Sequence, residues 1–386
     1  MSVDKNNSVR VHCCLQMIMK CGINTYQTEI TSRLLQYHDI DVDSLRVSMQ
    51  NFETDTDFPV RHVKFPGWLA FSNHETPLSR KIISCAFELV RPFISFNKLT
   101  GCNPEDVFVF FDNAMTALPI KGKVITVLHD VIALHSEFPH NKGPFRKGAE
   151  HAVKKSAKIV TVSEFSRKDI AEQLKIDPSK IDVVYNAVDT EKFSREKTSA
   201  ESLRALREKY GLPEKYILHL SRYNPRKNVK NFIRAYSMLP DKLKEEYGLV
   251  ITNPNDEVRK FAGECGVSSR VIYVDDISDS DKPGIYQLSS LFVWPSFMEG
   301  FGLPILEAQA SGIPVVSSNT SSMPEVAEDS AVYFDPYDVE GMSQAMAKCL
   351  DDEVLRGELV AKGYENLKRF SWDKSAKKFH DIIKNL

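Results

Sequence analysis

The sequence lacks the cysteine patterns that build disulfide frameworks and zinc sites. Its 7 cysteines are odd in number and scattered, and no Cys-x-x-Cys pair occurs among them. Disulfide-rich domains and structural zinc sites usually need closely spaced cysteines in pairs. We therefore expect neither of these, and we expect the chain to work in a reducing compartment.

Long apolar runs and an excess of one charge are also missing. No stretch approaches the ~20 apolar residues of a membrane span, and charged residues interrupt the first 20 residues, which lack a signal-type apolar core. The 50 Lys+Arg nearly balance the 52 Asp+Glu, so no overall charge attracts nucleic acid or an anionic membrane. We expect a cytoplasmic chain without a nucleic-acid partner, and peripheral contact with the inner face of the membrane stays open.

Several catalytic motifs are absent as well. The sequence has no Gly-x-Gly-x-x-Gly or Walker loop, which disfavours dinucleotide dehydrogenases and P-loop enzymes, and no His-Glu-x-x-His or Gly-x-Ser-x-Gly element of common hydrolases. Asp-x-Asp triplets at 41–43, 55–57 and 279–281 could bind Mg²⁺ or Mn²⁺. None follows a clear strand, so we interpret them as ordinary loop acids and expect no metal.

What is present is a repeating order of short apolar strands and helices. A length of 386 residues suggests two domains, and strands rich in Val and Ile that alternate with helices predict parallel sheets covered on both faces. The first series of apolar runs comprises 9–15, 107–111, 123–129, 158–163 and 181–186, and the second comprises 216–221, 248–252, 270–274, 291–295 and 313–318. We place the domain boundary in the charged segment 189–216, which gives domains 1–190 and 191–370.

The stretch "MEGFGLPILEA" (298–308) predicts a ligand site between a strand and a helix. Pro304 suits the start of a helix and Gly312 suits the position after its end, so we expect a helix over 304–311. Glu299 then lies in the loop and Glu307 about one turn into the helix. Such loops lie where parallel sheets bind ligands, and the helix N-terminus favours an anion. Two solvated glutamates in a buried turn are the alternative.

The segment "RYNPRKN" (222–228) follows the first strand of the second series. Arg222, Arg226 and Lys227 cluster there before a helix that we expect Asn228 to cap, and we expect Lys227 to lie on a surface loop. Cations on one side and helix amides on the other would suit a diphosphate. A solvated basic turn is the alternative. The apolar helix positions are Val229, Phe232, Ile233 and Tyr236.

The remaining candidate groups are carboxylates and one histidine. Glu307 suits ribose hydroxyls, which donate hydrogen bonds. Glu299 could accept hydrogen bonds from a sugar and stabilise positive charge at its anomeric carbon. His129 and Asp130 follow the strand at 123–129, and this histidine is either a structural group or a group that faces a ligand.

Taken in order, these segments resemble glycosyltransferase family 4, the retaining GT-B enzymes, and within it the mannosyltransferase-like branch that builds bacterial surface polysaccharides. The Glu-x7-Glu element with Gly-Phe-Gly inside is the most specific of them. The resemblance rests on Gly22, Ile23, Tyr26, "HD" (129–130), "VSEFS", "VYNAVD", "RYNPRKN", "YVDDIS", "PSFMEGFGLPILEA", "GIPVVSS", "MPEVAED", "YFDPYD" and "FSW".

The resemblance implies two Rossmann-like domains whose sheets face an interdomain cleft. The acceptor would bind to the amino-terminal domain and the nucleotide-sugar donor to the carboxyl-terminal one, and a last helix, 371–386, would cross back. The implied catalytic residues are Glu299, His129, Arg222 and Lys227. Implied donor-binding residues are Arg222, Lys227, Asp276, Ile277, Glu299, Gly300, Phe301, Gly302, Leu303, Glu307 and Gly22.

Two segments depart from the family pattern. The first loop, "MKCGINTY", has one glycine, Gly22, where many members have two or more, which puts amino-terminal contacts to the donor phosphate in doubt. Residues 66–105 match nothing assignable; they combine aromatic and basic residues, and so indicate either a surface near a lipid-linked acceptor or helices packed into the domain.

The function implied is retaining, metal-independent transfer of a hexose from a nucleotide diphosphate sugar to a glycan or lipid-linked oligosaccharide in O-antigen, capsule or exopolysaccharide synthesis. No cofactor is expected. The branch it resembles suggests mannose from GDP-mannose, and rhamnose, galactose or glucose from other nucleotides stay open. A GT-B-shaped protein that binds without catalysis and a nucleotide-sugar 2-epimerase are the alternatives. The sequence leaves the sugar, the base, the acceptor, the linkage and the oligomeric state open.

Overall fold

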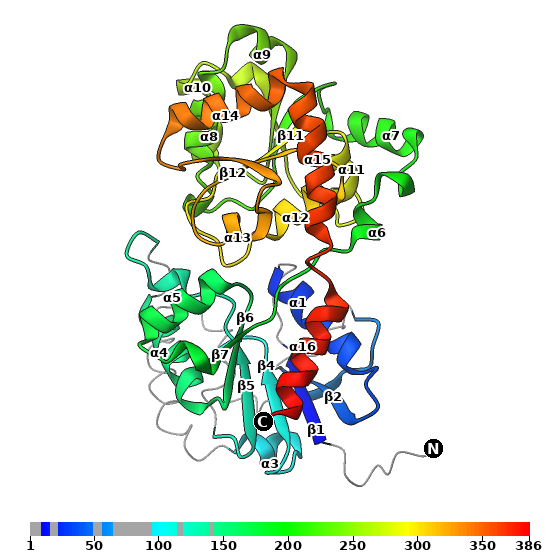
Figure 1. Cartoon of the computed structure of the whole chain (residues 1–386), viewed down its shortest axis with the longest axis vertical. Helices are drawn as coiled ribbons and strands as arrows, with labels where there is room; N and C mark the ends of the chain where they lie inside the picture. Colours follow the sequence, from blue (N-terminus) through cyan, green and yellow to red (C-terminus); the bar gives the residue numbers. More distant parts are fainter. Residues whose placement is uncertain (1–8, 16–21, 49–55, 65–94, 114–118, 139–141) are drawn as a thin grey trace. The chain divides into compact units, whose positions relative to one another are not determined.

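The computed structural model of the chain describes residues 9–15, 22–48, 56–64, 95–113, 119–138 and 142–386. The chain forms two compact units, drawn in Figure 1. The first unit comprises residues up to Val162, Ser166–Tyr185 and Trp372–Leu386, and the second comprises Ser163–Phe165 and Asn186–Ser371. Within the described part of the chain, no helix combines the length and apolar character that a membrane crossing needs.

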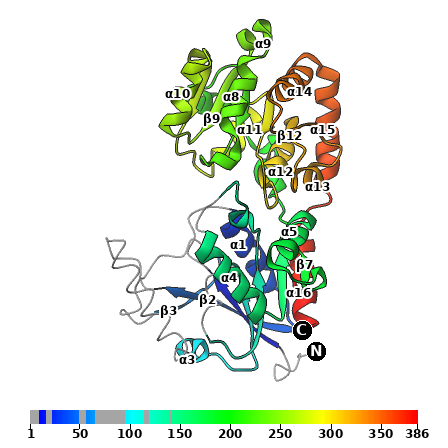
Figure 2. The same cartoon turned by 90° about the vertical axis from the view of Figure 1, so that its left-hand side faces the viewer.

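The first unit is built on a parallel sheet of seven strands in the order β3-β2-β1-β4-β5-β6-β7; Figure 2 labels β2, β3 and β7 of this sheet. Its strands are β1 (Val9–Leu15), β2 (Ile40–Ser48), β3 (Arg61–Lys64), β4 (Val107–Phe110), β5 (Lys123–Val127), β6 (Lys158–Thr161) and β7 (Ile181–Val183). The accompanying helices are α1 (Gly22–Leu34), α3 (Phe96–Thr100), η5 (Ile132–Leu134), α4 (Lys142–Lys155), α5 (Glu164–Leu174), η6 (Pro178–Lys180) and α16 (Trp372–Lys384).

The last helix of the chain belongs to the first unit. α16 packs along α1, and Figure 1 shows the two helices side by side in red and blue. Trp372 meets Tyr26 edge to face, with ring centroids 6.0 Å apart. Ser375 donates a hydrogen bond of 2.8 Å to the carbonyl oxygen of Tyr185. Burial of one face of α16 against α1 therefore attaches the carboxyl terminus to the first sheet.

The second unit repeats the architecture with six parallel strands in the order β10-β9-β8-β11-β12-β13. Its strands are β8 (Tyr216–His219), β9 (Gly248–Thr252), β10 (Val271–Val274), β11 (Leu291–Trp294), β12 (Val315–Ser318) and β13 (Ala331–Phe334). Its helices are α6 (Thr190–Phe193), η7 (Arg195–Lys197), α7 (Ala200–Tyr210), η8 (Pro225–Lys227), α8 (Val229–Ser237), α9 (Asp241–Glu246), α10 (Asp256–Glu264), η9 (Ser268–Arg270), α11 (Lys282–Gln287), α12 (Leu303–Ala310), α13 (Met323–Ala327), α14 (Val339–Asp351) and α15 (Glu353–Leu367).

The predicted apolar patterns form the cores of these units. Val229, Phe232, Ile233 and Tyr236 of α8 are all buried in one cluster with the strands of the second sheet. The predicted α/β class with two parallel sheets is confirmed. Because β8 pairs directly with β11, through Ile217 beside Leu291, the loops that follow these two strands leave the same edge of the sheet.

Three strands escaped prediction, and one interpretation was wrong. β2 and β3 carry polar residues that interrupt the apolar pattern, and β13 is a run of only four residues, Ala331–Phe334. Asp41 and Asp43, interpreted as loop acids, lie within β2 and pair in register with Arg10 and His12 of β1. Of the unassigned segment 66–105, residues 66–94 lie outside the described residues. Phe96 in the remainder is fully buried against Phe108 and Phe110, as the packed-helix alternative predicts.

Candidate functional site

The loop between β11 and α12 forms the centre of the candidate site. It runs from Pro295 to Gly302, and the helix begins at Leu303, one residue before the predicted start. Gly302 adopts the left-handed conformation with φ of 102° at the helix N-cap, where a side chain would be strained. The described structure shows no hydrogen bond from the amides of Gly302 and Leu303. Together with the helix dipole, these amides favour an anion.

Glu299 is a buried carboxylate that holds two cations. Its Oε1 lies 2.7 Å from Nζ of Lys227, and its Oε2 lies 2.6 Å from Nη1 of Arg226. Burial alone would raise the pKa of Glu299, but the charges of Arg226 and Lys227 lower it to about 2. Glu299 is therefore ionised at neutral pH, and the three groups together carry a net positive charge.

The basic loop after β8 is attached to the loop after β11. Asn224 caps η8 by accepting a hydrogen bond of 3.0 Å from the amide of Arg226. Asn228 occupies the N-cap position of α8 as predicted, but in the left-handed conformation, and its side chain makes no capping hydrogen bond to the helix. Its amide nitrogen donates instead to the carbonyl oxygens of Pro295 at 3.1 Å and Pro336 at 2.8 Å. The side chain thus fixes the cationic loop against the end of β11.

The indole of Trp294 lies beside both Lys227 and the start of α12. Nζ of Lys227 lies 4.3 Å from the centroid of the Trp294 ring, close enough for a cation–π attraction. A Cβ atom at Gly302 would lie 3.9 Å from Nε1 of the same indole. His219 stacks on the Trp294 ring, with ring centroids 5.5 Å apart. Lys227 and the N-terminus of α12 therefore lie against one aromatic side chain.

The two predicted phosphate cations lie in different surroundings. Lys227 was expected on a surface loop, but its side chain is only 14% exposed because Glu299 and Trp294 hold it. Arg222 is exposed. In the described part of the chain, no hydrogen bond or ion pair ties the Arg222 side chain to the others. The geometry joins Lys227 to Arg226, which the family pattern had not assigned.

Serine side chains after β12 hold the loop from the other side. Ser321 Oγ accepts a hydrogen bond of 3.0 Å from the amide of Glu299. Ser322 Oγ lies within hydrogen-bond distance of the carbonyl oxygens of Glu299 at 3.0 Å and Phe301 at 2.8 Å. Phe301 belongs to this loop, and its ring is buried against the ring of Phe370. Gly300 and Phe301, both predicted to bind the donor, are thus buried in a loop that serine hydrogen bonds hold in place.

Glu307 lies on the first turns of α12, as predicted, but it is not isolated. Its carboxylate pairs with Lys282 of α11 and accepts a hydrogen bond of 2.9 Å from Oη of Tyr286. Burial and the Glu307 charge raise the pKa of Tyr286 well above its ordinary value. The phenol therefore stays a donor to Glu307. Sequence reasoning missed Lys282, whose approach depends on the packing of α11 against α12.

Of the remaining donor-site candidates, Asp276 and Gly22 are exposed and Ile277 is half-buried. Asp276 follows β10 with a positive φ of 51°, and its amide donates to Oδ1 of Asn253 at 3.1 Å. Ile277 beside it is half-buried. Gly22 is the exposed first residue of α1 in the first unit, and residues 16–21 before it lie outside the described residues.

His129 lies directly after β5 in the first unit. Its ring meets Tyr26 edge to face at 5.2 Å, and burial lowers its pKa to about 4. The buried Nε2 atom has no hydrogen-bond partner among the described residues. His129 is therefore a neutral imidazole with one ring nitrogen still available, at the carboxyl end of a parallel strand.

Two family models match successive parts of the chain. Residues 22–192 match the model described as Glycosyltransferase Family 4. Residues 204–366 match the model described as Glycosyl transferases group 1. The second match contains all of the carboxylates and cations described above in the second unit.

Curated relatives include bacterial mannosyltransferases. The O-antigen chain mannosyltransferase B of Escherichia coli is 34% identical over 65% of this chain and 67% of its own length. The serotype-specific mannosyltransferase WbdA of Escherichia coli is 32% identical over 71% of this chain. That alignment spans only 36% of WbdA, so the chain matches about a third of that relative.

Solved structures share the fold along nearly the whole chain. HepE of Anabaena, in complex with UDP and glucose, has a TM-score of 0.74 at 16% identity and covers 98% of this chain and 100% of its own. WaaG, a glycosyltransferase involved in lipopolysaccharide biosynthesis, has a TM-score of 0.70 at 17% identity, covering 97% of this chain and 99% of its own. The predicted GT-B fold is confirmed, and the chain belongs to glycosyltransferase family 4.

Proposed function

We propose that the chain transfers a hexose from a nucleotide diphosphate sugar to a hydroxyl of a glycan or lipid-linked oligosaccharide. Transfer retains the anomeric configuration and uses no metal. The names of the Escherichia coli relatives make mannose, from GDP-mannose, the first sugar to test. Synthesis of a surface polysaccharide such as O-antigen, at the cytoplasmic side of the membrane, is the process in which this reaction would take place.

The observation that carries the proposal is the pairing of two cations with one buried carboxylate beside a helix N-terminus. Arg226 and Lys227 exceed the charge of Glu299 by one, and the amides at the start of α12 add a partial positive charge. A diphosphate brings the compensating negative charge. Charge-assisted hydrogen bonds contribute roughly 1.5–3 kcal/mol each, so a few of them suffice to hold the donor.

Binding of the diphosphate changes the partners of Glu299. The phosphate oxygens compete with this carboxylate for Lys227 and Arg226, and Arg222 adds a third cation from the exposed part of the loop. The carboxylate then accepts hydrogen bonds from the sugar and stabilises positive charge at its anomeric carbon. As the leaving diphosphate gains charge, the cations and the amides of Gly302 and Leu303 stabilise it, which lowers the barrier.

The other predicted residues have supporting roles in this proposal. Glu307 accepts hydrogen bonds from the ribose, and Lys282 and Tyr286 orient its carboxylate. Asp276 and Ile277 contact the base. His129, as a neutral imidazole, hydrogen bonds to the transferred sugar, and Gly22 allows the first loop to approach the donor.

The proposal assigns the donor to the segment 191–370 and the acceptor to the segment 1–190, with 371–386 as the returning helix. These assignments come from the family pattern. They make the second unit the place where nucleotide variants of the donor are distinguished. The first unit would then decide which glycan is extended.

A donor panel tests the proposal. GDP-, UDP-, dTDP- and ADP-sugars are added to the protein and the melting temperature is measured, since a ligand at 100 times its Kd stabilises by about 2.7 kcal/mol. The stabilising donor is then incubated without acceptor in the presence of a chelator. Slow release of free sugar is expected. Binding without any release would favour a non-catalytic binder, and conversion to an epimeric nucleotide sugar would favour the 2-epimerase. Loss of release on chelation that added Mg²⁺ or Mn²⁺, and not Zn²⁺, restores would contradict metal independence.

A further inference from the structure

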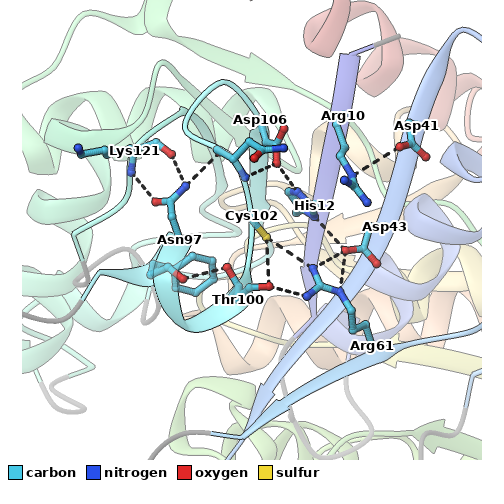
Figure 3. Close-up of polar contacts among 12 residues, drawn as sticks. Arg10, His12, Asp41, Asp43, Arg61, Asn97, Thr100, Cys102, Asp106 and Lys121 are labelled. Atoms are coloured by element: carbon cyan, nitrogen blue, oxygen red, sulfur yellow. Dashed lines mark hydrogen bonds and ion pairs between the residues drawn. The ribbon is translucent and has the colours of Figure 1, made fainter. Parts of the chain in front are cut away.

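A second group of polar side chains lies buried in the first unit, apart from the residues assigned above. Figure 3 shows this group, which we name the His12 cluster: His12 of β1, Asp43 of β2, Arg61 of β3, and Cys102 and Asp106 from the segment between α3 and β4. His12 and Asp106 are 1% and 6% exposed, and Cys102 is 8% exposed. Charged groups this deeply buried need partners.

His12 is held by two carboxylates. Its Nδ1 lies 3.0 Å from Oδ2 of Asp43, and its Nε2 lies 2.8 Å from Oδ2 of Asp106. Because ionised carboxylates only accept hydrogen bonds, both ring nitrogens of His12 donate in this arrangement. Without a bound ion, His12 is therefore a doubly bonded imidazolium.

The remaining members fix the positions of the two carboxylates and the thiol. Arg61 donates to Oδ2 of Asp43 at 2.6 Å and to Sγ of Cys102 at 3.5 Å. The backbone amide of Asn103 donates to Oδ2 of Asp106 at 2.7 Å. Each polar group that faces His12 is thus oriented by a second contact, as in metal sites whose ligands are held by an outer shell.

We propose that the His12 cluster is a Zn²⁺ site. The ligands are Nε2 of His12, Sγ of Cys102 and a carboxylate oxygen of Asp106, with water in the fourth position. Asp43 forms the outer shell by accepting a hydrogen bond from Nδ1 of His12, which fixes the tautomer that leaves Nε2 to the metal. Thiolate with imidazole favours Zn²⁺ over Mg²⁺ or Ca²⁺, which prefer oxygen ligands.

The geometry requires only small movements. The three ligand atoms all lie within 4.8 Å of one another. Zn–S of about 2.3 Å and Zn–N or Zn–O of about 2.0 Å in a tetrahedral site place ligand atoms roughly 3.3–3.6 Å apart. The hydrogen bond between His12 and Asp106 lengthens by about 0.5 Å, and the other separations shorten by at most about 1.3 Å.

The charges also balance. Zn²⁺ replaces one proton on Nε2 of His12 and one on the thiol of Cys102, so two positive charges enter as two protons leave. The formal charge of the cluster, including Arg61 and the two carboxylates, is then unchanged. No buried charge is left uncompensated in either state, which removes the main electrostatic penalty for binding the ion.

The position of the cluster indicates a structural role. Asp106 immediately precedes β4, whereas His129 follows β5, the neighbouring parallel strand. The His12 cluster and His129 therefore lie toward opposite edges of one sheet. Zinc at this position links β1 to the segment between α3 and β4, and it takes no part in the transfer chemistry proposed above.

The test uses the untagged full-length chain, freed of metal and then loaded with Zn²⁺ or Co²⁺. Elemental analysis should find one zinc per chain after dialysis, and cobalt should give a thiolate-to-metal charge-transfer band. Cys102→Ser, which keeps the side-chain size, should lose the band and the retained zinc. Cys265→Ser, at the half-buried thiol of the second unit, is the matched control and should behave as the unaltered chain. Asp43→Asn should weaken zinc binding roughly 10–100-fold without removing the band.

Two outcomes would overturn the proposal. The first is an unaltered chain that retains no zinc and shows no thiolate band, which would make the cluster a buried ion-pair network only. The second is a Cys102→Ser chain that retains zinc as the unaltered chain does, which would place the metal elsewhere. A melting temperature that rises with Zn²⁺ in the unaltered and Cys265→Ser chains, but not in Cys102→Ser, distinguishes site binding from adventitious zinc.

Discussion

The ammonium group of Lys227 lies 2.7 Å from the carboxylate of Glu299, although 72 residues separate them in the chain. Both side chains are largely buried, and Arg226 approaches the same carboxylate. Lys227, which is proposed to bind the donor, therefore also helps to hold the loop between β11 and α12 in place. Substitutions here affect stability and turnover together, and each experiment needs a control that separates the two.

Lys227→Ala should abolish turnover and also destabilise the second unit. Removing one partner of a buried ion pair leaves an uncompensated charge and costs about 3–5 kcal/mol; since Arg226 remains, we expect the lower end of that range. Lys230→Ala is the matched control, because its partner Glu257 is exposed and exposed pairs contribute about 0–1 kcal/mol. Chemical denaturation and donor turnover measure the two effects, and a Lys227→Ala enzyme of normal rate would remove the cation from the mechanism.

Glu299→Gln should lower kcat by roughly two orders of magnitude or more, because the carboxylate charge that stabilises the transition state is lost. The pH dependence of stability should change as well. The folded-state pKa of about 2 lies below the ordinary value of 4.5, so the ionised form stabilises the fold above pH 4.5 and this contribution disappears as the pH falls toward 2. The Glu299→Gln protein cannot lose stability in this way, because it has no carboxylate at this position to protonate. Equal slopes for both proteins over that pH range would contradict the assigned ion pair.

Gly302→Ala should weaken donor binding more than it weakens the fold. A side chain at φ of 102° costs roughly 1–2 kcal/mol and displaces the amides at the start of α12. Gly266→Ala is the control elsewhere in the second unit, where φ is 71° and a Cβ atom would meet no other atom within 4 Å. Calorimetric titration with the donor and thermal melting separate the effects. Equal donor affinity in the two variants would show that the helix start does not bind the phosphates.

Glu307→Gln should remove the preference of the protein for nucleotides whose ribose carries the 2′ and 3′ hydroxyls. The comparison uses a nucleoside diphosphate and its 2′,3′-dideoxy form, which differ only in the groups that Glu307 is proposed to accept from. The unaltered chain should bind the ribose form more tightly, by roughly 1.5–3 kcal/mol for hydrogen bonds to a charged group. Glu307→Gln should bind the two forms nearly equally. An unchanged preference would assign Glu307 to the structural pair with Lys282 alone.

Local sequence rules predicted the strand-loop-helix elements of the second unit well. Gly302, Pro304 and Gly312 each have a backbone preference that limits where α12 starts and ends, and Val229 to Tyr236 show the helical period of a buried face. These signals act over a few residues. They therefore place Glu299 in a loop and Glu307 on a helix without knowledge of the rest of the chain.

Partners from distant segments could not be predicted in this way. Nothing near Glu299 in the sequence indicates that Arg226 and not Arg222 approaches it, because that choice depends on the turn of η8 and on Asn228 bonding to Pro295 and Pro336. His12, Cys102 and Asp106 likewise come from segments about 90 residues apart. Their spacing has no motif, and only the pairing of β1 with β2 and β4 brings them together.

A crystal structure of the chain with the nucleotide diphosphate sugar that stabilises it would show whether the diphosphate binds at Lys227 and the start of α12. We expect phosphate oxygens within hydrogen-bond distance of Nζ of Lys227 and of the amides of Gly302 and Leu303, with the sugar beside Glu299. A diphosphate bound elsewhere, with Lys227 and Arg226 still paired to Glu299 and the start of α12 empty, would contradict it.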